Sequence, residues 1–172
     1  MILMSYDGSA DAQAAIDRLA DVMPGATLTV LTVWEPFMQT MARTGMGMGM
    51  GMGVTGGYSG TDAERVDEGI RQAALETATD GTERATAAGL VAKPWIEQRD
   101  GAVATTILAV ADDIDADVIV MGTRGRGGTK AFLLGSVSRA VVEHAERAVL
   151  VVPSPELAAR RRAQAHRWVA QV

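Results

Sequence analysis

The chain has 172 residues, of which 48% are hydrophobic, so it is long and apolar enough for one domain with a substantial core. It has no cysteine, which excludes disulfides, zinc–thiolate sites and a cysteine nucleophile. The net charge of -5 argues against general nucleic-acid binding, which needs a basic surface. No apolar run approaches the roughly 18 residues of a membrane span, and no signal peptide is evident. We therefore expect a cytoplasmic protein that binds neither nucleic acid nor membrane.

Hydrophobic periodicity predicts strands that alternate with helices. In chain order, the expected elements are a strand over 2–5, a helix over 12–23, strands over 27–34 and 91–98 with a helix over 61–88 between them, a helix over 103–111, a strand over 118–121, a helix over 137–144 and a strand over 148–152. Gly81 is a weak point of the long helix, and Pro94 favours a sheet edge for its strand. This alternation is typical of an α/β fold with a parallel sheet and helices on both faces.

Two segments depart from this pattern. Regular periodicity disappears over 37–60, and Gly and Met alternate strictly over 45–53. Glycine at every second position is unfavourable in a strand, so we interpret the segment as a flexible insertion without a ligand. The alternatives are a Cu(I) site built from its methionines and a lid over a ligand. The segment over 154–172 is basic and helix-prone, and either packs on a partner subunit, touches an anionic surface or is solvated.

A glycine pattern follows the strand that ends at Met121. It reads Gly122-x2-Gly125-x9-Gly135-Ser136 and runs from a strand to the start of a helix. Such loops offer backbone N–H groups and the positive end of a helix dipole to phosphate. Gly122 and Gly125 could allow positive φ or a close approach of the backbone to the ligand. The alternative is an ordinary glycine-rich connection in which Ser136 caps the helix.

The turn at Asp7 is expected to lie beside this loop. Right-handed crossovers place every strand-to-helix connection at one end of a parallel sheet, where ligands of such sheets bind. Asp7 either contacts the ligand or caps the first helix, and Arg124 and Arg126 either reach a phosphate or are solvated. No pair of nucleophile and base is recognisable.

These residues together resemble the ATP-binding universal stress proteins. The similar segments are Tyr6-Asp7-Gly8-Ser9, the strand ending at Thr32-Val33, Asp117 to Gly122, the glycine pattern, and Ala148 to Pro153. The resemblance spans most of residues 1–153, which we expect to form the nucleotide-binding domain, with an insertion at 37–60 and an extension at 154–172. It implies a Rossmann-like fold with five parallel strands in the order 3-2-1-4-5.

The resemblance also implies a ligand, a site and a partner. The ligand is ATP, often accompanied by Mg²⁺ or Mn²⁺, and no separate protein metal site is expected. Asp7 and the Val33 backbone would hold the adenosine, Met121 and Gly122 would line the path to the phosphates, and Arg124 is a candidate phosphate contact. The residues around the phosphates would be Gly125, Gly135, Ser136, Val137 and Ser138. A homodimer is implied through strand 148–152, an apolar edge in a monomer.

The predicted function is that of an ATP-binding protein of the stress response, acting as a nucleotide-dependent switch or binding module. The glycine pattern places no general base, so we expect at most weak ATPase activity or autophosphorylation. One alternative is an enzyme of a related fold that hydrolyses ATP or transfers AMP with the help of Arg124 or Lys130. The other is a dimeric interaction protein that works without nucleotide.

Overall fold

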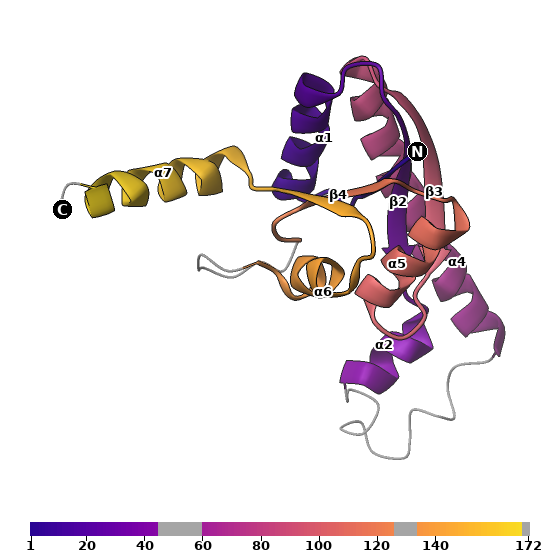
Figure 1. The fold of residues 1–172 in the computed structure, drawn as a ribbon. Coiled ribbons are helices and arrows are strands. Elements are labelled where there is room, and N and C mark those ends of the chain that lie inside the picture. Colours follow the sequence, from indigo (N-terminus) through magenta and orange to yellow (C-terminus); the bar gives the residue numbers. More distant parts are fainter. Residues whose placement is uncertain (45–59, 126–133, 170–172) are drawn as a thin grey trace.

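A computed structural model shows one parallel sheet with helices on both faces (Figure 1). The structure describes residues 1–44, 60–125 and 134–169, without the side chains of 60–61 and 164–169. The strands are β1 (Ile2–Ser5), β2 (Thr27–Trp34), β3 (Val91–Gln98), β4 (Val118–Gly122) and β5 (Ala148–Val152). Neighbouring strands are all parallel, in the order β3-β2-β1-β4-β5. The predicted Rossmann-like α/β fold, its strand order and the edge position of the strand with Pro94 are confirmed.

Helices cover the sheet in two layers. The described helices are α1 (Ala10–Val22), α2 (Phe37–Thr44), α4 (Gly60–Ala87), α5 (Val103–Asp113), α6 (Ser136–His144) and α7 (Pro155–Val169). Helices α1 and α4 contribute to the hydrophobic cluster on one face of the sheet, and α5 and α6 to the cluster on the other. Both faces of the inner strands are therefore buried, which is why these strands read as nearly continuous apolar runs in the sequence.

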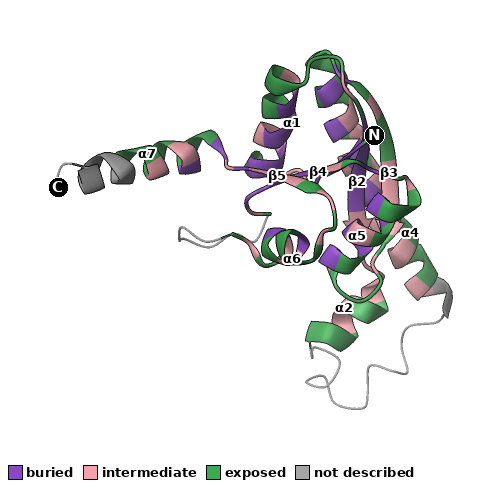
Figure 2. Ribbon diagram, viewed as in Figure 1, coloured by how far each residue is buried: buried purple, intermediate pink, exposed green. Residues whose placement is uncertain are grey.

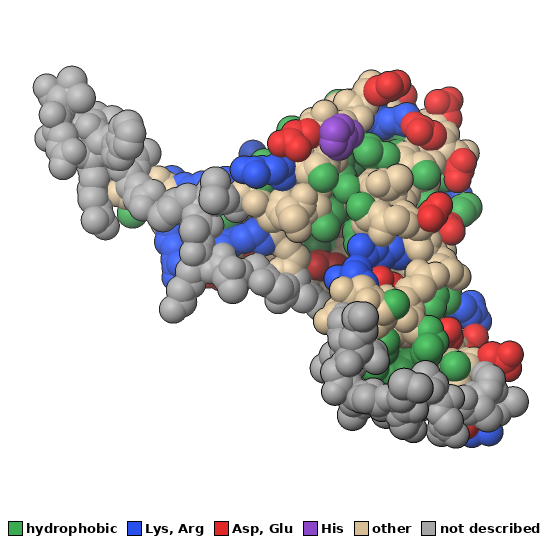
Figure 3. All heavy atoms as spheres, turned by 90° about the horizontal axis from the view of Figure 1, so that it is seen from below, with side chains coloured by type: hydrophobic (Ala, Val, Ile, Leu, Met, Phe, Trp, Pro, Cys, Tyr) green, Lys and Arg blue, Asp and Glu red, His purple; other side chains and the backbone are tan. Residues whose placement is uncertain are grey.

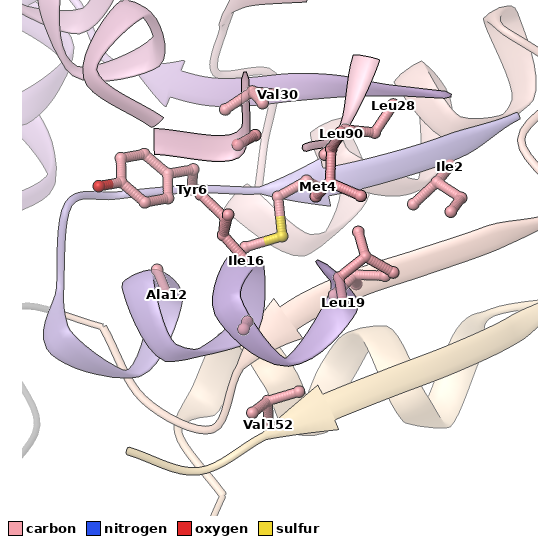
Figure 4. Close-up of a cluster of buried hydrophobic side chains, with 13 residues drawn as sticks. Ile2, Met4, Tyr6, Ala12, Ile16, Leu19, Leu28, Val30, Leu90 and Val152 are labelled. Atoms are coloured by element: carbon pink, nitrogen blue, oxygen red, sulfur yellow. The ribbon is translucent and has the colours of Figure 1, made fainter. Parts of the chain in front are cut away.

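One hydrophobic cluster joins α1 to the inner strands of the sheet. Met4 of β1, Val30 of β2, and Ile16 and Leu19 of α1 belong to this cluster, and all four side chains are fully buried (Figure 4). Each buried side chain of this size contributes about 1.5–3 kcal/mol relative to exposure. The inner strands are thus supported by a packed core; Figure 2 shows buried residues in purple along β2.

Helix α4 passes through Gly81 without a break. A Cβ at Gly81 would lie 2.7 Å from Cδ1 of Tyr6, so glycine lets the helix approach the tyrosine ring. The residue predicted as a weak point is therefore a point of close packing.

The expected loop over 37–60 is wrong in its first part, because residues 37–44 form α2. The helix is held by tertiary contacts that sequence periodicity does not register: the Phe37 N–H donates to the Asp67 carboxylate of α4 at 2.7 Å. The Gly–Met alternation over 45–53 lies outside the described residues. None of the helices that the structure describes combines the length and the apolar character that a membrane crossing requires.

Candidate functional site

The candidate site lies at the end of the sheet where the strands finish. Since the strands are parallel, the loops after β1, β2 and β4 meet at this end, together with the start of α6. Figure 3 views the molecule from this side and shows acidic and basic side chains next to one another near the middle, bordered by hydrophobic side chains. The sequence-predicted residues can be placed within this region one segment at a time.

The turn between β1 and α1 is built by Asp7, Gly8 and Ser9. Gly8 has φ +75°, which favours glycine, and the Asp7 Oδ1 accepts a hydrogen bond from the Ser9 N–H at 3.0 Å. The Ser9 Oγ accepts from the Ala12 N–H at 3.3 Å and caps α1. The structure therefore assigns the helix cap to Ser9, and Asp7 shapes the turn that precedes it.

The loop after β4 lies directly against this turn. The Ser9 hydroxyl donates to the Arg124 carbonyl at 3.2 Å, across 115 residues of sequence. A Cβ added to Gly125 would lie 2.4 Å from the Asp7 Oδ2, so the Asp7 carboxylate approaches the glycine backbone closely. The predicted convergence of Asp7 with the glycine pattern is present in the structure.

Gly122 and Gly125 serve close approach rather than special dihedral angles. Neither has positive φ, so that part of the expectation is wrong. A Cβ at Gly122 would lie 2.6 Å from the carbonyl carbon of Asp11 and 2.7 Å from the backbone nitrogen of Ala12. Glycine is needed there because the start of α1 packs directly on the end of β4.

The start of α6 is hydrogen-bonded to the loop that follows β4. The Gly135 N–H donates to the Thr123 carbonyl at 2.9 Å, and the buried Ser138 hydroxyl donates to that carbonyl at 2.8 Å. Gly135 is the N-cap and makes no side-chain cap bond, so Ser136 is the first helical residue and not the cap. The exposed Ser136 therefore stands at the positive end of a helix dipole, where an anion is stabilised.

The other predicted site residues lie on β2, at the end of β4 and in α6. Val33 is half-buried near the end of β2, and Val137 packs against the second core cluster. The Met121 side chain is buried in that cluster, which leaves its backbone for a ligand. Arg124 is half-buried beside the β1–α1 turn. Arg126 and Lys130 lie outside the described residues.

An ion network beyond β2 and β3 was not predicted. The Glu35 carboxylate accepts hydrogen bonds from the Arg43 Nε at 3.1 Å and from the Arg99 Nη1 at 3.1 Å. The backbone N–H of Arg99 donates to the Trp34 carbonyl at 2.7 Å. The hydrogen bond from Arg43 is the main cause of the lowered pKa of Glu35; burial opposes it, and the charge of Arg99 lowers the pKa further. The signal in the sequence was the position of Glu35 directly after β2 and of Arg99 directly after β3.

Tyr6 lies at the start of the β1–α1 turn and holds it against neighbouring elements. Its hydroxyl donates to the Asp80 Oδ2 at 2.6 Å, and its carbonyl accepts from the buried Thr32 hydroxyl at 2.9 Å. Burial raises the pKa of the Tyr6 phenol to about 12, with a further contribution from the hydrogen bond to Asp80. The residue just before Asp7 is thus held in a fixed position by both neighbouring elements.

In the part of the chain that the structure describes, no three His, Asp or Glu side chains are grouped to hold a metal ion. The site is defined instead by backbone amides, hydroxyls and glycines at the carboxyl ends of parallel strands. An α/β protein with this strand order and these loops at the point where the order reverses belongs to the doubly wound class. The chain is a member of the universal stress protein family, whose model matches residues 1–153.

Individual relatives agree with this assignment. Universal stress protein MJ0531 of Methanocaldococcus jannaschii is 43% identical over 60 residues, which is 35% of each chain. The matched stretches span about a third of the length of the first curated relatives.

Solved structures extend the likeness to most of the chain. The structure of hypothetical protein MJ0577 has a TM-score of 0.66 at 21% identity, covering 88% of this chain and 94% of the other. A universal stress protein family member from Arabidopsis thaliana, with AMP bound, has a TM-score of 0.58 at 16% identity, covering 88% and 90%. At these identities the likeness shows the fold.

Proposed function

We propose that this chain binds an adenine nucleotide, and ATP in particular, as a cytoplasmic switch or binding module of the stress response. The observation that carries the proposal is the hydrogen bond from the Ser9 hydroxyl to the Arg124 carbonyl, which joins the β1–α1 turn to the glycine loop. This contact brings a carboxylate, backbone amides and a helix start into one region. Family membership and the AMP bound in the Arabidopsis thaliana family member support the same ligand class.

The roles proposed for the site residues are those that the resemblance to the universal stress proteins implies. Asp7 and the Val33 backbone hold the adenosine, the backbone of Met121 and Gly122 leads toward the phosphates, and Arg124 offers positive charge. The phosphates are surrounded by Gly125, Gly135, Ser136, Val137 and Ser138. Backbone N–H groups at the α6 start supply most of the donors, and Mg²⁺ or Mn²⁺ would be held mainly by the phosphates.

We further propose a homodimer through β5. This strand is the last in the sheet, so one of its edges has no partner strand within the described chain. Val149, Leu150 and Val151 are only half-buried there, and an apolar strand edge favours pairing with another strand.

Calorimetric titration of the nucleotide-free protein with ATP tests the proposed binding. Gly125→Ala places a methyl group where the Asp7 carboxylate now lies, at an exposed backbone position outside the core. We expect it to weaken ATP binding about tenfold or more, which corresponds to about 1.4 kcal/mol. The control is Gly69→Ala, because a Cβ at Gly69 meets no atom within 4 Å and should leave affinity unchanged.

Two results would contradict the proposal. One is the absence of any binding heat from wild-type protein whose circular dichroism shows it to be folded. The other is equal ATP affinity in Gly125→Ala and wild type, since that would separate the glycine loop from the ligand.

A further inference from the structure

Helix α7 packs little against the other described parts of the chain. It leaves the end of β5 and extends away from the rest of the molecule (Figure 1). Leu157 in its first turn is buried, whereas Ala159, Arg160 and Arg162 are exposed (Figure 2). Isolated helices of about 15 residues are marginal in water, so α7 needs a surface on which to pack.

The charge of this segment is opposite to that of the domain. Residues 155–172 contain four arginines (Arg160, Arg161, Arg162 and Arg167) and one acid, Glu156. The segment carries a net charge of +3, and the preceding 154 residues carry -8, which together give the -5 of the chain. A basic helix joined to an acidic domain is complementary to a second copy of that domain.

Several exposed acidic residues lie at one end of the sheet, close to the start of β5. Val118 at the start of β4 pairs with Ala148 at the start of β5, and Arg147 donates to the Ala111 and Ala116 carbonyls. The segments flanking these residues carry exposed acids, which we call the acidic end: Asp113, Asp115, Glu143 and Glu146. Glu143 has a long contact of 4.0 Å with the exposed Arg139.

We propose that α7 is an arm that binds the acidic end of a second copy of this chain. The inference rests on the proposed homodimer through β5. A two-fold axis pairs the two β5 edges antiparallel, and this places the carboxyl end of one strand beside the amino end of the other. The arm that leaves the end of one β5 then points toward the partner's Glu146 and its acidic neighbours.

The lengths are compatible with this contact. Five strand residues span about 17 Å, and a 15-residue helix is about 22 Å long. Pro155 follows Val152 after two intervening residues, so the exposed Arg160 and Arg162 fall within the first two to three turns of the arm. By symmetry each dimer has two such contacts, and each arm packs on the other subunit.

Sedimentation equilibrium of charge variants tests the arm. The double variant Arg160→Glu with Arg162→Glu reverses two exposed charges on α7. The control variant Arg18→Glu with Arg65→Glu makes the same charge change at exposed positions on α1 and α4. We expect the arm variant to raise the dimer Kd about tenfold or more, and the control to change it less than about threefold.

A compensating variant identifies the surface that the arm meets. Asp113→Lys with Glu146→Lys, combined with the arm variant, should recover most of the lost affinity, and added NaCl should weaken the wild-type dimer. A dimer whose Kd is unchanged by the arm variant would overturn the arm and leave the β5 dimer standing. Binding of wild-type protein, but not of the arm variant, to vesicles of phosphatidylserine, with that unchanged Kd, would assign α7 to an anionic surface instead.

Wild-type protein that stays monomeric at every concentration would overturn both the arm and the homodimer. The calorimetric titration with ATP is independent of this outcome, because every residue proposed for the nucleotide lies before α7.

Discussion

The contact between Gly122 and α1 allows a quantitative test of how the site is held together. Gly122→Ala would place a Cβ 2.6 Å from the carbonyl carbon of Asp11 and 2.7 Å from the backbone nitrogen of Ala12. These are backbone atoms at the start of a helix, and no side-chain rotation can relieve the overlap. Overpacking of a core costs about 1–3 kcal/mol, so we expect a loss near the upper value, about 3 kcal/mol in the free energy of unfolding.

Urea unfolding followed by circular dichroism measures this loss, and calorimetry should show a melting temperature about 6–12 °C lower. The matched control is Gly69→Ala in α4, where a Cβ meets no atom within 4 Å. That variant should be about 0.5–1 kcal/mol more stable than wild type, because alanine favours a helix. A Gly122→Ala protein within about 0.5 kcal/mol of wild type would refute the close packing of α1 on β4.

Two further predictions concern the polar contacts around the site. Folding raises the pKa of Tyr6 from its ordinary value of 10.0 to about 12. The contribution of the neutral phenol to the stability of the fold is therefore complete below pH 10.0 and is lost as the pH rises toward about 12. Tyr6→Phe, without the hydrogen bond to Asp80, should be about 1 kcal/mol less stable at pH 7 and lack this alkaline decline in urea unfolding. Because the pKa of Glu35 is lowered, its stabilisation is present above its ordinary value of 4.5 and is lost as the pH falls below it. Glu35→Gln weakens the contacts to Arg43 and Arg99, so its free energy of unfolding at pH 7 should be about 1 kcal/mol below that of wild type, and this difference should not grow as the pH falls. A variant as stable as wild type at pH 7 would contradict this.

Strand positions were predictable because apolar β-branched runs are bounded by residues that end strands. The strand over 148–152 is followed by Pro153, and the strand over 27–34 is preceded by Pro24 and Gly25. The strand order was not available from periodicity, and it came from the resemblance to a family. Helix α2 was missed because its stability depends on contacts with α4, such as that of Phe37, which local sequence does not encode.

The general location of the candidate site was predictable from the sequence, but its individual contacts were not. Parallel topology alone indicates that Asp7 and Gly125 lie at one end of the sheet, and the structure places them in contact. Sequence reasoning missed the direct contact between Ser9 and Arg124, since it joins residues 115 positions apart. It also misjudged Gly122, because the need for glycine there arises from the backbone of another element.

The proposed nucleotide site is built from four separate segments of the chain. Titration of isotope-labelled protein with ATP, followed by amide chemical shifts in NMR, would show whether all four segments meet the ligand. We expect saturable shifts concentrated at residues 7–9, around Val33, and over 121–125 and 135–138. Absence of saturable shifts in folded protein, or shifts confined to other parts of the chain, would contradict the proposed site.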